Sequence, residues 1–424
     1  MQFSNTSQEL FDFTIENFNK CLIKNTENEQ KIQNKMFDKF FLDIREADKY
    51  IKTIHAFHNC LTGLIKEIET TKQLKLPLLG NYFPLDIKKD IELNTINQII
   101  YSCEINNKKI FINFFTSNHE IDITIYNKYA KQIFMLIAIL THYSSKECSQ
   151  ILNIYIYFTD FKRMLPDKNY DILEHYNVNG GLTTTCDKNS EIFVYRKEEW
   201  FKVLTHELFH NLGLDFSAMD VRDIHNKIKK LFPIDSKINL YESYCEFWAR
   251  LLNLVFCSYN VIDNKNDKET FVLCMEFFIQ IERIFSLFQC NKILNFLGLR
   301  YKDLYNNDNA SKIARENLYR EKTNVFAYYV VTTFLLDNYI NVMTWCNDNN
   351  LLFFQFNNTK KTLDLFYNLI ESSYSRNSFL KNLECVSNST EKYKKNKRQT
   401  KYRNKEFNKH DILKTTRMTI MEFK

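Results

Sequence analysis

His206, Glu207 and His210 are the residues whose types and spacing could do chemistry in this chain. On a helix, residues i and i+4 lie on the same face, so two imidazoles at this spacing can converge on one metal ion, as in the H-E-x-x-H pattern. The glutamate then lies beside an open coordination position, where a carboxylate can take a proton from water whose pKa the metal has lowered. The spacing therefore indicates metal-assisted hydrolysis.

The segment around this motif is almost entirely apolar. Outside the motif, Lys202 and Asn211 are the only strongly polar residues at positions 200–213. A helix that is apolar on all sides is a buried helix, and histidines and glutamates inside it need partners because unpaired polar groups are costly there. This favours a metal site over the alternative, a solvated helix that carries two histidines by accident.

A catalytic zinc ion normally has three protein ligands and one open position. The extended pattern with a third histidine six residues after the second is disfavoured, because Phe216 occupies that position and Asp215 is out of register. A further apolar helix expected at 241–259 instead carries Glu242 and Glu246 on one face. Two buried carboxylates require a cation or hydrogen-bond donors.

These two carboxylates allow three assignments. In the favoured one, Glu242 is the third ligand and Glu246 accepts a hydrogen bond from His206, because outer carboxylates commonly orient zinc-bound histidines in this way. The reverse order, with Glu246 as the ligand, stays open. So does a purely structural pairing of both acids with Arg250 or other bases.

The motif with its flanks, residues 203–212, resembles the long signature of zincin metallopeptidases. The later Glu242-x-x-x-Glu246 is similar to the gluzincin branch, with one departure: Glu246 stands where the best-known members carry Asp. Residues 212–217 and the helix around 241–249 are also similar to uncharacterised predicted metallopeptidases of large DNA viruses. The resemblance covers roughly residues 95 to 260, outside which the chain shows no such likeness.

The resemblance implies a zincin-like fold, in which a mixed β-sheet packs on the active-site helix and an edge strand binds extended peptide by strand addition. In this sequence the edge strand is expected to include Gly180, Gly181, Leu182 and Thr183. The implied activity is a zinc metallopeptidase with one Zn²⁺ per chain and a peptide or protein substrate. The alternative is a catalytically inactive zincin-like binding or virion-associated protein, which the intact glutamate of the motif disfavours.

Zincins also place a Tyr or His across the cleft to stabilise the oxyanion of the transition state. The resemblance nominates Tyr328 or Tyr329 for this role, with His225 as a further candidate. Core packing is an equally strong interpretation of the two tyrosines, because buried aromatic side chains most often serve that purpose.

The remaining sequence predicts an α+β protein with a mainly helical C-terminal part. Two runs rich in Ile, Phe and Tyr, at 96–105 and 109–116, indicate strands joined by a hairpin turn at Asn106 and Asn107. Further strands are expected at 151–158, 178–185 and 191–195. Apolar residues at helical spacing indicate helices at 8–24, 28–73, 129–143, 200–213, 221–232, 241–259, 269–289, 317–347 and 363–373.

These elements predict five regions of the chain. Residues 1–80 form an N-terminal helical hairpin, 81–216 an α/β subdomain that contains the active-site helix, and 217–385 a helical subdomain that carries the third ligand. The Lys-rich residues 386–411 are expected to be disordered because they contain few apolar side chains. Residues 412–424 regain apolar character and are expected to dock back onto the protein.

The positive charge of the chain is concentrated in one segment. The net charge is +6, yet residues 391–409 alone contain nine Lys or Arg against two Glu, so the remainder is close to neutral. This segment could tether the protein to nucleic acid or to another acidic surface. A solvated basic segment is the commoner interpretation, and we do not expect nucleic-acid binding to be the main role.

Composition indicates a soluble protein of a reducing compartment. The cytoplasm is expected, with the cytoplasm of a host cell or a virion as further possibilities. The longest apolar run, residues 133–140, is far shorter than a membrane span, and the first residues do not resemble a secretory signal. The eleven cysteines are scattered without a C-x-x-C pair. We therefore expect no membrane partner, no disulfide framework and no cysteine zinc site.

Overall fold

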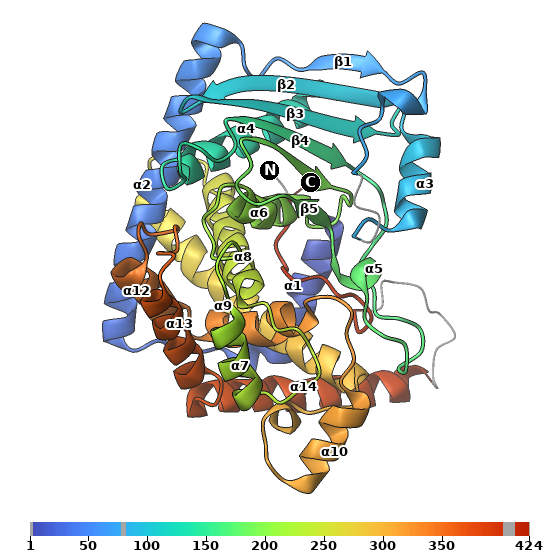
Figure 1. Cartoon of the computed structure of the whole chain (residues 1–424), viewed down its shortest axis with the longest axis vertical. Coiled ribbons are helices and arrows are strands. Elements are labelled where there is room, and N and C mark those ends of the chain that lie inside the picture. The colour runs from blue at the N-terminus through green and yellow to red at the C-terminus, as the bar shows by residue number, and fades with distance from the viewer. Residues whose placement is uncertain (1–2, 78–81, 402–411, 424) are drawn as a thin grey trace.

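The computed structural model describes residues 3–77, 82–401 and 412–423, and its centre is a six-stranded mixed sheet (Figure 1). The strands follow the order β1-β2-β3-β4-β6-β5. The pairs β3–β4 and β4–β6 are parallel, whereas the pairs β1–β2, β2–β3 and β5–β6 are antiparallel. Their bounds are β1 Leu64–Glu67, β2 Asn97–Ile105, β3 Lys108–Thr116, β4 Ile151–Tyr157, β5 Gly181–Thr183 and β6 Asn189–Val194.

The five strands predicted from the sequence are all present, and β5 lies at one edge of the sheet. Asn106 and Asn107, the predicted turn between β2 and β3, both adopt positive φ, as a two-residue hairpin turn requires. Strand β1 was not predicted, because its residues fall within the helix expected at 28–73. That helix ends at His58, where Asn59 takes a left-handed conformation with φ of 52° and terminates it.

Side chains alternate between the two faces of the sheet, as the strand period of two requires. On one face, Leu152, Ile154 and Ile156 of β4 join the main hydrophobic core. On the other, Tyr157 of β4 joins a smaller cluster, which includes Ile87 of helix α3. Helices α4 and α6 lie against the main-core side, so the motif helix packs directly under the sheet.

The other half of the molecule is helical (Figure 1). Helices α8 and α9 are buried along most of their length and form its centre, and α6 packs on α8. The α-helices are α1 Asn5–Phe18, α2 Glu27–His58, α3 Leu85–Asn94, α4 Ile123–Thr141, α5 His175–Val178, α6 Trp200–Asn211, α7 Arg222–Leu231, α8 Leu240–Val261, α9 Lys268–Phe296, α10 Asn309–Leu318, α11 Thr332–Asp337, α12 Tyr339–Asn349, α13 Lys360–Ser373 and α14 Asn377–Lys401. Short helical turns are η1 Asn19–Cys21, η2 Thr71–Gln73, η3 Tyr301–Leu304 and the π-helix η4 Phe326–Val331.

Two helical predictions differ from the structure. The single helix expected at 317–347 is instead divided among α10, η4, α11 and α12. The basic segment expected to be disordered from residue 386 is helical as far as Lys401, and at its start Val386 and Thr390 are buried whereas Lys392 and Lys395 are exposed. The rest of that segment, residues 402–411, and the predicted boundary at 80–81 lie outside the described residues.

The C-terminal residues dock as predicted. Residues 416–421 are almost completely buried, and Phe3 stacks on Phe423 at the far end of the segment. The main hydrophobic core is continuous from α1 through α9 to this segment. The two ends of the chain therefore pack together inside one body.

Two cysteine pairs correct the expectation of reduced cysteines. Cys21 is bonded to Cys385, and Cys148 to Cys186. Sequence spacing gave no sign of these pairs, since their partners are 364 and 38 residues apart and meet through tertiary packing. Within residues 3–77, 82–401 and 412–423, none of the helices combines the length and apolar character that a bilayer span requires.

Candidate metal centre

Helix α6 carries the motif and is buried at every one of its positions. The chain enters it through Glu199, which has a left-handed conformation with φ of 56°, and leaves it at Gly213, with φ of 63°. A side chain at position 213 would be strained by this conformation and would also meet Cys148 Sγ at 3.2 Å. The helix is thus fixed between the edge of the sheet and α8.

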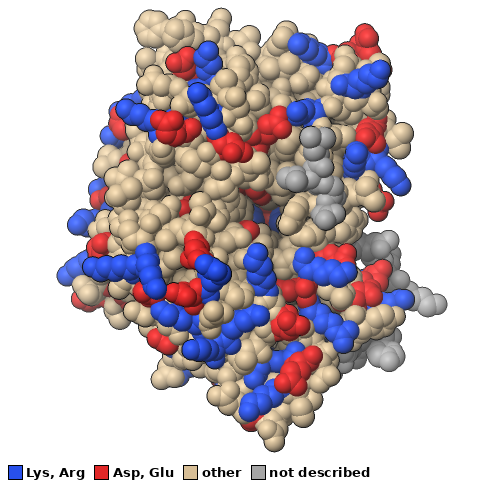
Figure 2. Space-filling model, in the orientation of Figure 1, with Lys and Arg blue, Asp and Glu red and all other residues tan. Residues whose placement is uncertain are grey.

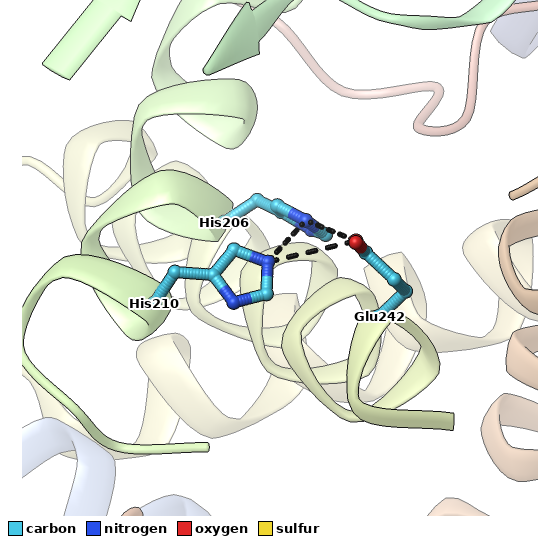
Figure 3. Close-up of side chains that lie close together, drawn as sticks. All are labelled: His206, His210 and Glu242. Carbon is cyan, nitrogen blue, oxygen red and sulfur yellow. Dashed lines mark hydrogen bonds and ion pairs between the residues drawn. The ribbon is translucent and has the colours of Figure 1, made fainter. Parts of the chain in front are cut away.

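His206, His210 and Glu242 converge on one point (Figure 3). The Nε2 atoms of the two histidines are 3.2 Å apart, and Glu242 Oε2 lies 3.1 Å from His206 Nε2 and 3.5 Å from His210 Nε2. In a tetrahedral zinc site with bonds of about 2.0–2.1 Å, ligand atoms are about 3.3–3.4 Å apart. The three separations match this geometry.

The hydrogen-bond pattern behind these atoms also fits a cation. Nδ1 of His210 pairs with Asp215, and Nδ1 of His206 lies 3.2 Å from Glu246 Oε2. When each Nδ1 carries the proton, both Nε2 atoms present lone pairs to each other and to the Glu242 carboxylate. Three acceptors at such distances repel one another unless a cation lies between them. The three side chains could therefore hold a metal ion.

Glu246 connects the centre to a buried lysine. Lys202 Nζ donates hydrogen bonds of 2.9 and 3.0 Å to the two carboxylate oxygens, and both side chains are at most 3% exposed. Burial opposes the ionised form of Glu246, but Lys202 and His206 outweigh it and hold the pKa of this carboxyl at about 2. Its contact with His206 has the geometry of an ion pair rather than a well-aligned hydrogen bond.

Asp215 is a member of the centre that sequence reasoning missed. Its position in the sequence is out of register for a metal ligand, yet its carboxylate lies behind His210. The carboxylate also accepts hydrogen bonds from the Cys245 thiol at 3.2 Å and from the Ser217 amide at 2.8 Å. Burial raises the pKa of the Cys245 thiol well above its ordinary value, so the thiol acts as a donor. The sequence signal for this placement is Gly213, which ends α6 and turns the following residues, including Asp215, back toward His210.

Glu207 lines a narrow cavity of about 20 Å³ together with His206, Gly180 and Gly181. Burial raises the pKa of Glu207, while the neighbouring histidines oppose the shift. A carboxylate that is more basic than usual is suited to accept a proton. Figure 2 shows that Lys and Arg are interspersed with Asp and Glu over the face of the molecule seen in Figure 1.

The two candidate tyrosines point in different directions. Tyr328 Oη donates a hydrogen bond of 2.8 Å to Glu242 Oε2, so this side chain is part of the centre. Tyr329 is excluded from it, because its hydroxyl donates to the backbone carbonyl of Thr416. Both lie in the π-helix η4, where neighbouring residues point in different directions as on any helix, and π-helical turns are frequent at functional sites. His225 lies 3.4 Å from the carbonyl of Ile238 and is outside the centre.

The predicted edge strand lies directly over α6. An added Cβ at Gly181 would lie 3.1 Å from Glu207 Cγ and 2.8 Å from Val203 Cγ1, so only glycine permits this approach. Asn211 Nδ2 donates a hydrogen bond of 3.0 Å to Thr183 Oγ1 and thereby fixes the strand to the end of the helix. The outer edge of β5, including Leu182, has no further strand beside it among the described residues.

Comparison with known proteins places this chain near a viral protein. It is 26% identical to Uncharacterized protein R210 of Acanthamoeba polyphaga mimivirus in an alignment of 310 residues that covers 69% of this chain and 73% of the viral protein. No family model matches the chain, and no solved structure matches it. The name of the viral protein assigns no activity, so the chemistry must be argued from the centre itself.

Proposed function

We propose that the chain is a zinc-dependent metallopeptidase of the gluzincin type, with His206, His210 and Glu242 as the ligands of one Zn²⁺. The observation that carries the proposal is the triangle of three acceptor atoms at 3.1–3.5 Å, with a carboxylate behind each histidine. Such outer carboxylates fix the tautomer and orientation of zinc-bound histidines.

The surrounding elements support a peptidase rather than another zinc hydrolase. A zincin-like arrangement requires a mixed sheet over the motif helix and an antiparallel edge strand beside the metal. The antiparallel edge strand β5 supports this choice, because its residues Gly181, Leu182 and Thr183, together with the preceding Gly180, could align an extended peptide backbone.

Zn²⁺, when bound, polarises the scissile carbonyl and lowers the pKa of water. Glu207 accepts a proton from the attacking water and passes it to the leaving amine, which its raised pKa favours. The hydroxyl of Tyr328 lies next to Glu242 and can turn to donate a hydrogen bond to the negative charge that develops on the carbonyl oxygen. Glu246 and Asp215 hold the two imidazoles in place.

Metal analysis together with a Glu207→Gln variant tests this proposal. Purified protein should contain about one zinc per chain, and the variant should retain the zinc while losing cleavage of a peptide library. His206→Ala should lose the metal, whereas His225→Ala, a histidine outside the centre, should retain both metal and activity. Undiminished cleavage by Glu207→Gln refutes the mechanism. Zinc binding without any cleavage favours the alternative of an inactive, metal-holding binding protein.

A further inference from the structure

The C-terminal segment, residues 412–423, forms part of the wall of the candidate active site. Figure 1 shows it as the red coil that passes beside α6. The Met418 amide donates a hydrogen bond of 2.9 Å to Glu199, the residue that begins α6. The amide of Thr419 also donates to Glu199, and the amide of Ile420 donates to Glu282. The carbonyl of Met421 accepts a hydrogen bond of 2.9 Å from the Asn253 side chain. Gln289 also donates to the carbonyl of Arg417, so the backbone of this segment is fixed on both sides of Met418.

The Met418 side chain reaches the cavity that contains Glu207. It lines this cavity together with Gly181 of the edge strand and Val203 of the motif helix. Its Sδ lies 3.3 Å from Lys202 Nζ, and the residue is 3% exposed. The thioether thus occupies space between the edge strand and the helical half that would otherwise deepen the cavity.

The remaining room is small. The cavity measures about 20 Å³, and a cavity of roughly 10–15 Å³ by this kind of measure holds one water molecule. A peptide that lies along β5 with its scissile carbonyl at the metal centre must direct one of the two flanking side chains toward Glu207 and Val203. A hydrogen atom, a methyl group or a hydroxymethyl group fits there, whereas a branched or aromatic side chain does not.

We infer that Met418 is a specificity-determining residue, which restricts one position next to the scissile bond to glycine, alanine or serine. The inference rests on the proposed peptidase function and deepens it by naming a substrate class. Its physical basis is the exclusion of larger side chains by a buried side chain whose backbone is fixed. Neither residue type nor position in the sequence marks Met418 for this role, because the segment is far from the motif in the chain.

Cleavage of a peptide library by Met418→Ala tests the inference, with Met421→Ala as the matched control. Met421 is a buried methionine of the same segment, 1% exposed, but it lines a different cavity beside Trp200 and Asn253. Wild type and Met421→Ala should both require a small residue at one flanking position. Met418→Ala should accept leucine or methionine there with kcat/KM higher by roughly 10-fold, the lower end of the range for a methylene in a hydrophobic pocket, because Lys202 and Glu246 also line the cavity.

A Met418→Leu variant separates specificity from stability. Leucine conserves most of the volume and should keep the restriction to small residues, while a matched zinc content and thermal midpoint for the two alanine variants exclude a folding effect. Wild-type cleavage with leucine or phenylalanine at both flanking positions overturns the inference and leaves the peptidase proposal intact. An unchanged profile in Met418→Ala does the same. Absence of cleavage in every variant, despite bound zinc, instead overturns the peptidase proposal and the inference with it.

Discussion

The buried pair of Lys202 and Glu246 provides a test that separates folding from metal binding. Both side chains are at most 3% exposed and are joined by two hydrogen bonds. Burial lowers the pKa of Lys202 to about 8, although Glu246 opposes the shift, so both groups are charged at neutral pH. Lys202→Met leaves a buried carboxylate without its main partner, and breaking a buried pair in this way costs about 3–5 kcal/mol in the free energy of unfolding.

The double variant Lys202→Met/Glu246→Gln should recover most of this loss, since replacement of both members of a buried pair by uncharged side chains is often nearly neutral. Zinc affinity should behave differently. Glu246→Gln removes the carboxylate behind His206, alone or in the double variant, and should weaken zinc binding by roughly 10–100-fold. Urea unfolding of the metal-free proteins and competition with a zinc chelator measure the two quantities.

The pair of Arg250 and Glu282 is a matched control for this cycle. It lies between α8 and α9, its Nε–Oε1 distance is 2.7 Å, and both side chains are at most 2% exposed. The corresponding Arg250→Met/Glu282→Gln cycle should show comparable changes in stability with unchanged zinc affinity. If Glu246→Gln binds zinc as tightly as wild type, the assignment of Glu246 behind His206 is refuted. If Lys202→Met costs no stability, the energetic reasoning about the pair is refuted.

Three further predictions concern single residues. Asp215→Asn removes the charged partner of His210 and should weaken zinc binding by roughly 10–100-fold; equal affinity in a chelator titration would contradict this role. Tyr328→Phe should retain zinc and lower kcat by roughly 10²–10³-fold, the effect of removing one oxyanion donor. An unchanged kcat would contradict the role of Tyr328 as an oxyanion donor. Burial raises the pKa of Glu321 from 4.5 to about 7 despite hydrogen bonds to its ionised form, so its contribution to stability is complete below pH 4.5 and is lost as pH rises through 7. Glu321→Gln should therefore gain about 1–3 kcal/mol over wild type between pH 5 and pH 8 in urea unfolding, with allowance for partial exposure, and parallel pH profiles would contradict the assignment.

Local spacing was sufficient to predict much of this protein from its sequence. The five strands, the buried motif helix and the i, i+4 convergence of His206 and His210 follow from the periods of strand and helix, which act over a few residues. The same reasoning placed Glu242 and Glu246 on one face of α8. It favoured Glu242 as the third ligand but left the reverse order open, because the choice depends on how α8 crosses α6.

Tertiary structure decided the rest of the centre. The crossing of α6 and α8 places Glu242 at the two Nε2 atoms and Glu246 at Nδ1 of His206. Asp215 reaches His210 because Gly213 reverses the chain, and Tyr328 rather than Tyr329 reaches Glu242 because of the way η4 packs against α8.

The disulfides and the C-terminal segment show the same limit over longer separations. Cys21 meets Cys385, and Met418 meets Lys202, more than two hundred residues away in the chain. Such contacts cannot be predicted from the spacing of residues in either segment, since each side chain has only the pattern of an ordinary buried residue of its own segment. The sequence by itself therefore determined that one helix presents His206 and His210 on the same face, and only the packing of distant segments determined what lies behind them and how much room remains beside Glu207.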